Sequence, residues 1–373
     1  MPELFEKTAL KSLELENRSV RSATWSGVGD AKGHVTDRGP EIYGDLARGG
    51  VGLIITGFQY VMPNGVGIVH QVGNYDDSQI DGLTRLTSAV HVENGKVAAQ
   101  LVHTGTKANA KLFPEPGRIW GPSPVTDPLS GNLADEMSSG EITQLIEAYA
   151  AAASRSKKAG FDAIQLHGAH GYGINQFLSG FFNRRGDGYG GDIKRRYRFL
   201  GEVMEAVRGE VGNDFPVLIK LSGHDYHEGG LVPDESLYVA RRLADDGIDA
   251  IEVSAGSRAS NENLMPSRLH IRNEEDEAYL ADLAAMCKQA ARVPVMAVGG
   301  IRSPGVISSI LSEGKADYVA MCRPFIREPH LINRWKSGDL AGATCISCNG
   351  CFEAAAEGNG VYCMVDKKLK NRQ

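Results

Sequence analysis

The chain lacks the features that mark membrane, secreted and nucleic-acid-binding proteins. No apolar run approaches the roughly 20 residues that a membrane-spanning helix needs. The first residues, Met1 to Lys7, have neither the basic nor the hydrophobic region of a signal peptide. The formal net charge of −6 gives no electrostatic reason to expect nucleic acid or an anionic membrane as a partner. We therefore expect a cytoplasmic protein, in which thiols stay reduced unless a metal binds them.

The rest of the composition is that of an ordinary globular protein, with 42% hydrophobic and 23% charged residues in a chain of 373. Apolar, β-branched segments alternate with segments of helical period along most of the chain. The predicted strands are residues 19–24, 51–57, 97–102, 163–167, 217–222, 250–254, 295–298 and 318–322. The predicted helices include residues 141–158, 197–208, 236–245 and 277–290. Eight strand–helix units over about 300 residues favour an α/β fold, a closed (β/α)8 TIM barrel, over an open doubly wound sheet.

Two segments interrupt this alternation. Residues 114–140 are rich in Pro, Gly and Ser and follow the third predicted strand. Long loops are often functional, so we expect a loop or hairpin over the C-terminal face of the barrel, where TIM-barrel active sites lie. The tail after Trp335 contains four of the six cysteines. We therefore expect a barrel over residues 1–335 and a short cysteine-rich extension over residues 336–373, packed on the barrel.

Three proton-handling side chains lie within six residues at the end of the fourth predicted strand. His167 ends that strand, and the glycine-rich turn after it carries His170 and Tyr172. Two imidazoles and a phenol can donate hydrogen bonds to a developing oxyanion and supply a proton to carbon. A lone histidine at a strand end is more often structural, but two histidines and a tyrosine among glycines indicate a catalytic site.

Polar residues at other predicted strand ends suit a phosphorylated cofactor. Gly299 and Gly300 end the seventh strand, and Arg323 follows the eighth. Such glycines free backbone N–H groups to approach phosphate and arginine adds a cationic fork, although two glycines also make an ordinary tight turn. The amide of Gln100 suits the edge of a uracil-like ring. Lys220 lies between apolar residues and needs an anionic partner, either a cofactor ring or a buried carboxylate.

The cysteine spacing in the tail predicts a metal centre. Cys345, Cys348 and Cys351 are separated by two residues each, and Cys363 follows after eleven more. Three closely spaced thiols with a distant fourth match four-thiolate iron–sulfur ligation, so we expect a [4Fe–4S] cluster. Zinc is the alternative, although its structural sites usually combine paired Cys or Cys/His units, and free thiols are a third reading.

Taken together, these residues resemble the old yellow enzyme family of FMN-dependent barrel oxidoreductases, over essentially the whole chain. The match includes residues 16–24 (ENRSVRSAT), 49–57 (GGVGLIITG) and 100–105 (QLVHTG). Its most specific part is residues 167–172 (HGAHGY), followed by 175–179 (NQFLS), 182–185 (FNRR) and 188–191 (GYGG). The set is specific, whereas any one piece alone is a weak signal.

The resemblance implies how FMN would be held. Backbone groups of Ala23, Thr24 and Gly57 would line the flavin, Gln100 would bond its pyrimidine edge, Lys220 would stand near N1 and O2, and Gly299, Gly300, Cys322 and Arg323 would hold the phosphate. Two positions depart from the family. Lys220 replaces the usual arginine, which keeps the charge but loses the bidentate geometry, and Cys322 replaces a glycine.

The resemblance also implies the chemistry of a small-molecule substrate. His167 and His170 would hold the carbonyl or nitro oxygen of an electron-poor alkene, such as an enone or enoyl thioester. Hydride would pass from flavin N5 to the β-carbon, and Tyr172 would protonate the α-carbon. NAD(P)H would supply the electrons.

The cysteine tail resembles the branch that contains 2,4-dienoyl-CoA reductase and trimethylamine dehydrogenase, in which such a cluster lies next to the flavin. Members of that branch continue into nucleotide-binding domains, whereas this sequence stops ten residues after Cys363. We therefore expect a separate electron-transfer protein as a partner, or a cluster that mainly fixes the segment.

Two other functions stay open at this point. One is an amine dehydrogenase, but amine enzymes of the branch have Tyr at the position of His167, which favours the reductase. The other is a phosphate-binding lyase or isomerase with Lys220 as a Schiff-base residue.

Overall fold

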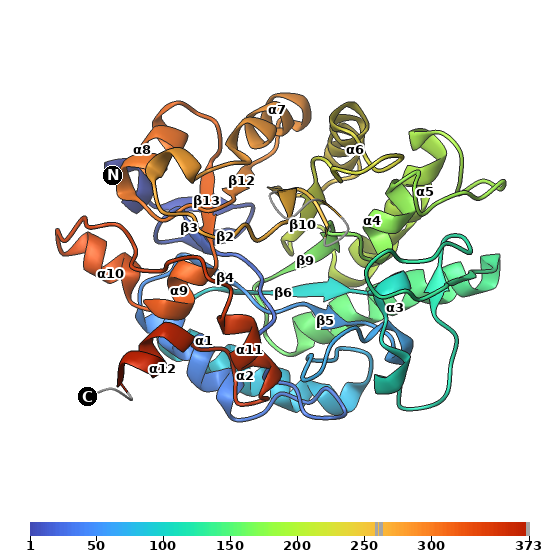
Figure 1. Cartoon of the computed structure of the whole chain (residues 1–373), viewed down its shortest axis with the longest axis horizontal. Coiled ribbons are helices and arrows are strands. Elements are labelled where there is room, and N and C mark those ends of the chain that lie inside the picture. Colours follow the sequence, from blue (N-terminus) through green and yellow to red (C-terminus); the bar gives the residue numbers. More distant parts are fainter. Residues whose placement is uncertain (258–259, 261–263, 371–373) are drawn as a thin grey trace.

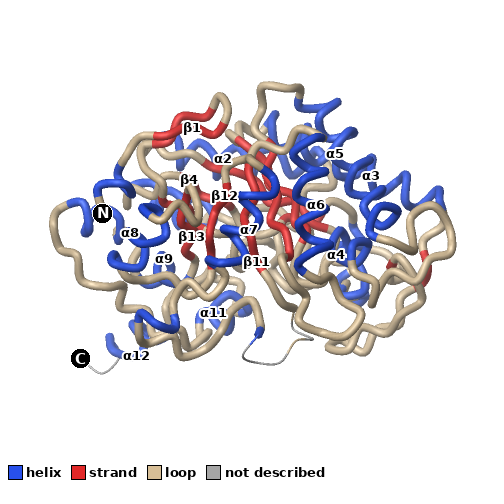
Figure 2. The backbone as a smooth tube through the Cα atoms, turned by 90° about the horizontal axis from the view of Figure 1, so that it is seen from above, coloured by secondary structure: helices blue, strands red, loops and turns tan. Residues whose placement is uncertain are grey.

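Eight parallel strands form a closed barrel at the centre of the computed structural model, which describes residues 1–257, 260 and 264–370 (Figures 1 and 2). The barrel strands are β3 (Ser19–Arg21), β4 (Leu53–Ile55), β6 (Val97–Val102), β9 (Ala163–Gly168), β10 (Val217–Ser222), β11 (Ala250–Ser254), β12 (Val295–Val298) and β13 (Tyr318–Met321). Each strand pairs in parallel with the next one in this order, and β13 pairs with β3 to close the ring. All eight lie where the sequence predicts them, so the (β/α)8 TIM barrel is confirmed.

Helices surround the strands and cover their outer faces (Figure 2). They are α1 (Arg38–Arg48), α2 (Ile80–Val92), α3 (Ser139–Lys158), α4 (Gly173–Leu178), α5 (Ile193–Val211), α6 (Pro233–Asp245), α7 (Ala281–Ala291), α8 (Pro304–Ser312), α9 (Arg323–Arg327) and α10 (Leu331–Lys336). Helix α7 begins four residues after the predicted position, because Ala278 has a φ of +52°, which a right-handed helix does not accommodate. None of the described helices has the length and apolarity needed to cross a lipid bilayer.

Short elements occupy the loops between these helices and strands. They are the 3-10 helices η1 (Pro2–Phe5), η2 (Pro63–Gly65), η3 (Asp77–Gln79), η4 (Gly105–Lys107), η5 (Ala110–Leu112) and η7 (Glu274–Asp276), and the strand β5 (Gln59–Tyr60), which pairs with β6.

An N-terminal hairpin closes one end of the barrel. Its strands, β1 (Thr8–Leu10) and β2 (Leu13–Leu15), pair antiparallel. Leu10, Leu13 and Leu15 belong to one buried cluster with inward-facing residues from all eight barrel strands, among them Leu218 and Met296. Burial of these apolar side chains seals the N-terminal end, so the polar residues of the interior gather toward the C-terminal ends of the strands.

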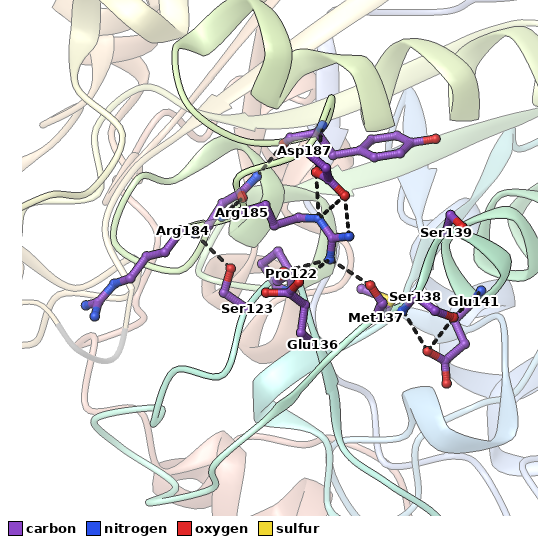
Figure 3. A network of polar contacts seen from close by, with 12 residues as sticks. Pro122, Ser123, Glu136, Met137, Ser138, Ser139, Glu141, Arg184, Arg185 and Asp187 are labelled. Atoms are coloured by element: carbon purple, nitrogen blue, oxygen red, sulfur yellow. Dashed lines mark hydrogen bonds and ion pairs between the residues drawn. The ribbon is translucent and has the colours of Figure 1, made fainter.

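The predicted long loop is an excursion that carries two short paired strands, β7 (Trp120–Gly121) and β8 (Asp135–Glu136). A buried arginine fastens this loop to the chain after α4 (Figure 3). Arg185 Nη1 donates to the carbonyls of Pro122, at 2.9 Å, and Met137, at 2.7 Å, while its Nε and Nη2 bind the Asp187 carboxylate. Because one guanidinium binds both arms of the loop and the Asp187 carboxylate, the loop keeps a defined position over the barrel face.

The cysteine-rich segment packs against the barrel through α11 (Cys351–Ala356) and α12 (Met364–Lys370), which lie beside α1 and α9 (Figure 1). Gly27 has a φ of +63°, and a side chain there would collide with the backbone of Ala355. The backbone N–H of Gly360 donates to the Gly27 carbonyl at 3.2 Å. This close approach fits the predicted packing, whereas the division into two domains at residue 335 stays a prediction.

Candidate active site

The three proton-handling side chains predicted from the sequence lie together at the C-terminal end of β9. The ring centroid of His167 is 5.1 Å from that of His170 and 4.9 Å from that of Tyr172, both in edge-on arrangements. The Phe58 ring lies 5.6 Å from Tyr172 and 6.2 Å from His167, and so forms an apolar wall beside them. The rings converge on one region of the barrel mouth, as a site for a single small ligand requires.

The turn that carries His170 is held in an uncommon backbone conformation. His170 has a φ of +63° and Gly171 a φ of +72°. Asn175 Oδ1 accepts the Gly171 N–H at 2.6 Å, and Lys107 Nζ donates to the His170 carbonyl at 2.8 Å. The ring is fixed by a contact of 2.7 Å between Nε2 and Ser254 Oγ. A left-handed non-glycine residue held by this many hydrogen bonds is typical of a functional site.

Both histidines are neutral near neutral pH. Burial is the largest cause that holds the pKa of His167 well below its usual 6.5, and the positive charges of Lys220 and Lys107 lower it further. Burial likewise lowers the pKa of His170, with additional contributions from His167 and the same two lysines. A neutral imidazole carries one N–H donor and one acceptor, so each ring can donate one hydrogen bond to an oxygen above it.

Lys220 has a buried carboxylate as its partner, one of the two partners that the sequence leaves open. Its Nζ lies 2.6 Å from Glu252 Oε1, and both side chains are almost inaccessible to solvent. Strand pairing places Lys220 of β10 directly beside His167 of β9 and Glu252 of β11. The ion pair therefore lies level with the candidate catalytic histidine.

Gln100 is joined to this pair through a second glutamine. Gln100 Nε2 donates to Gln165 Oε1 at 2.7 Å, and Gln165 Nε2 donates to Glu252 Oε2 at 2.9 Å. Sequence reasoning missed Glu252, Ser254 and Lys107. For Glu252 the signal was present, because a charged residue inside an otherwise apolar strand is the pattern that identifies Lys220.

The candidate phosphate residues lie together at the ends of β12 and β13. Gly299 and Gly300 have φ values of +125° and +72°, which side chains rarely adopt. Arg323 Nη1 donates to the Arg268 carbonyl at 2.8 Å and to Asn349 Oδ1 at 2.8 Å. Arg268 itself stacks on Tyr279, with its Cζ 4.0 Å from the ring centroid.

This region fits an anion. In the described part of the chain neither Arg268 nor Arg323 pairs with a carboxylate, and the buried Arg268 Nε has no hydrogen-bond partner. Burial raises the pKa of Tyr279, and both guanidinium groups act in the opposite direction, which places two positive charges around one phenol. Two guanidinium groups that have no carboxylate partner among the described residues, beside a glycine turn, suit the phosphate of FMN.

The residues predicted to line the flavin lie at the ends of β3 and β4. Ala23 is partly exposed and packs on the barrel interior, and Thr24 Oγ1 is within hydrogen-bond distance of Cys322 Sγ. The Gly57 N–H donates to Tyr43 Oη at 2.9 Å, so this glycine offers a ligand its carbonyl rather than its amide. A side chain at Gly57 would collide with the Thr24 carbonyl, which keeps this wall of the mouth open.

The four predicted ligand cysteines lie near one another but are not arranged as a metal centre. Cys351 is buried, Cys345 and Cys363 are partly buried, and Cys348 is exposed. The pKa of Cys351 is raised to about 12, mainly by burial; the neighbouring thiols, Cys322 among them, act in the same direction and Arg323 acts in the opposite one. Among residues 1–257, 260 and 264–370, no group of three or more His, Cys, Asp or Glu side chains is placed to hold a metal ion. The donor chemistry fits a cluster, which stays a prediction.

The fold and the residues at its mouth define a TIM barrel with a polar site at the C-terminal ends of its strands. Within that class, the chain belongs to the NADH:flavin oxidoreductase / NADH oxidase family, whose model matches residues 3–340. The predicted family resemblance is thereby confirmed.

Three relatives illustrate the similarity. A metal reductase from Desulforamulus reducens is 36% identical over 97% of this chain and 53% of that protein. An NADPH dehydrogenase from Geobacillus thermodenitrificans is 36% identical over 88% of this chain and 92% of that protein. A solved structure of 2-naphthoyl-CoA reductase with 2-naphthoyl-CoA has a TM-score of 0.90 at 28% identity, over 99% of this chain and 57% of that one. The chain thus spans about half the length of two of these relatives.

Proposed function

We propose that the protein is an FMN-dependent oxidoreductase that uses NAD(P)H to reduce a C=C bond activated by a carbonyl or nitro group, such as that of an enone or enoyl thioester. The observation that carries this proposal is the convergence of His167, His170 and Tyr172 on one point of the barrel mouth. Bound FMN would supply hydride transfer from NAD(P)H to the β-carbon of the alkene. Gln100, Lys220 and the phosphate residues around Arg323 would hold it.

The two histidines would bind the oxygen of the electron-withdrawing group. The Ala169 N–H donates to His167 Nδ1 at 3.4 Å, which leaves the proton of this neutral ring on Nε2. With the Ser254 hydroxyl as donor to His170 Nε2, the proton of that ring would lie on Nδ1. Each ring then has one N–H for the substrate oxygen, and the pair stabilises the negative charge that develops there.

Tyr172 would donate the proton that completes the reduction at the α-carbon. The ammonium group of Lys107 lies 5.6 Å from the centroid of the Tyr172 ring. A positive charge at this distance stabilises the phenolate that forms when the proton leaves. The Phe58 ring packs against the tyrosine, with ring centroids 5.6 Å apart, and would help to keep water from that part of the site.

The relatives support this chemistry without fixing the substrate. The name NADPH dehydrogenase points to a nicotinamide as the electron source, and the 2-naphthoyl-CoA complex points to a thioester-activated ring as a substrate class. We further propose a cytoplasmic enzyme in which Cys345, Cys348, Cys351 and Cys363 hold a [4Fe–4S] cluster, with a separate protein as electron partner. Iron and acid-labile sulfide analysis of protein purified without oxygen tests the cluster.

The reaction is tested with anaerobically purified protein, a cyclic enone and an enoyl-CoA. We expect a yellow protein that couples NAD(P)H oxidation to alkene reduction. Tyr172→Phe should slow alkene reduction by about 100- to 10,000-fold, the usual size of general acid catalysis, and should leave flavin reduction by NAD(P)H unchanged. A colourless protein that does not bind added FMN would refute the proposal, and flavin reduction by amines alone would support the dehydrogenase instead.

A further inference from the structure

Lys220 and Glu252 form an ion pair in the barrel interior that is almost completely shielded from solvent. Glu252 lies in the middle of β11 and is completely buried, and Lys220 beside it is 3% exposed. The nitrogen–oxygen distance of 2.6 Å is short even for a charge-assisted hydrogen bond. A lone buried charge is strongly unfavourable, so each member of this pair keeps the other in place.

Both oxygens of the Glu252 carboxylate are used. Oε1 accepts hydrogen bonds from Lys220 Nζ and from Ser22 Oγ, the latter at 2.6 Å, and Lys220 also contacts Ser22 Oγ at 2.8 Å. Oε2 accepts from Gln165, which in turn accepts from Gln100. Three side chains therefore hold one carboxylate, and the position of Lys220 is fixed by Glu252 and Ser22 together.

The pair also determines the charge of the barrel mouth. Lys220 alone would place a full positive charge level with His167, and Glu252 at 2.6 Å cancels most of its field a few ångströms away. The reduced form of a flavin carries negative charge that the oxidised form lacks. A cation whose charge is partly cancelled therefore favours the reduced form less than an isolated cation would.

We propose that Glu252 is a positioning residue that holds Lys220 and limits how strongly the barrel favours reduced over oxidised flavin. The inference rests on the proposed function, because it needs FMN at the mouth. Glu252 also helps to position Gln100, because it accepts a hydrogen bond from Gln165, which accepts one from Gln100. One carboxylate therefore orients two of the side chains predicted to contact the flavin.

The test compares the affinities of oxidised and reduced FMN for wild-type protein and for Glu252→Gln, both measured without oxygen. Glutamine keeps the shape and an acceptor for Lys220 but removes the negative charge. The ratio of the two affinities should shift toward reduced FMN by about tenfold, which raises the two-electron midpoint potential by about 30 mV.

Asp249→Asn is the matched control. Asp249 precedes β11 at the opposite end of the barrel, where it binds Arg208 and Lys11. Its substitution removes a poorly exposed carboxylate from the same part of the chain, so it should lower stability and leave the affinity ratio unchanged.

A folded Glu252→Gln variant that binds FMN with a ratio within about twofold of wild type would overturn the inference and leave the proposed function intact. If that variant does not fold, the double variant Lys220→Gln/Glu252→Gln is used instead. It replaces an ion pair of zero net charge with two uncharged side chains. We expect its ratio to stay within about threefold of wild type. A fall of about tenfold would mean that Lys220 acts with its full charge, which also overturns the inference. Wild-type protein that binds no FMN refutes the proposed function itself.

Discussion

The barrel mouth and the cysteine-rich segment differ in what fixes their geometry. At the mouth, Lys220 and Glu252 are paired within the chain, and the neutral histidines have their own hydrogen-bond partners. In the segment, four thiols lie close to one another without forming a metal centre among the described residues. Hydrogen bonds between strands build the first region, whereas a metal would complete the second, because thiolate sites form together with the ion they bind.

Breaking the ion pair at the mouth should have the largest effect. Lys220→Met leaves the Glu252 carboxylate buried without a cation, and such losses cost about 3–5 kcal/mol. Denaturant unfolding should therefore show a large fall in the free energy of unfolding. The double variant Lys220→Met/Glu252→Leu should recover most of it, because two apolar residues replace the whole pair. If the free energy of unfolding of the single variant is less than about 1 kcal/mol below that of wild type, this pair does not fix the mouth.

Features of the structure that depend on neighbouring residues in the sequence could be predicted, whereas contacts between residues distant in the sequence could not. The eight strands and the His167–Tyr172 turn were predictable, because burial and glycine are local signals. The pairing of Lys220 with Glu252 was not, since it joins positions on neighbouring strands that are 32 residues apart. The start of α7 was wrong by four residues because the backbone of Ala278 is left-handed, and no residue type in the sequence signals this.

The second prediction concerns the pH dependence of stability and tests how completely the mouth shields the neutral side chain of His103 from solvent. His103 directly follows β6, stacks on Trp120 and is 1% exposed. Burial lowers its pKa from 6.5 to about 4, so the unfolded chain takes up this proton at a higher pH than the folded protein does. The stability that neutral His103 contributes is therefore complete above pH 6.5 and is lost as the pH falls toward 4. The full loss is about 3 kcal/mol.

The variant His103→Asn isolates this contribution, because its amide can still accept the Gly105 N–H but does not titrate. Between pH 7 and pH 4, the free energy of unfolding of wild type should fall by about 3 kcal/mol more than that of the variant. The histidines at 167 and 170 titrate in both proteins and cancel in the difference. Parallel curves would show that His103 reaches solvent.

The smallest effect is expected where the two regions meet. Asn349, between Cys348 and Cys351, accepts from Arg323 at 2.8 Å and donates to the Ser267 carbonyl at 3.0 Å. Its φ of +57° is a conformation that glycine and asparagine tolerate best. Asn349→Gly therefore loses the two side-chain bonds alone, about 2 kcal/mol, and Asn349→Ala adds backbone strain of about 1–2 kcal/mol.

Thermal unfolding and FMN titration of the two variants test whether Asn349 couples the cysteine-rich segment to the phosphate residues. If Asn349 positions Arg323 for the cofactor phosphate, Asn349→Gly should weaken FMN binding by about fivefold, the effect of losing one hydrogen bond of about 1 kcal/mol. Asn349→Ala should unfold at a lower temperature than Asn349→Gly, which reverses the usual order of alanine and glycine. Unchanged FMN affinity in both variants would mean that the cysteine-rich segment packs on the barrel without influencing the phosphate residues, so the two regions would be energetically independent.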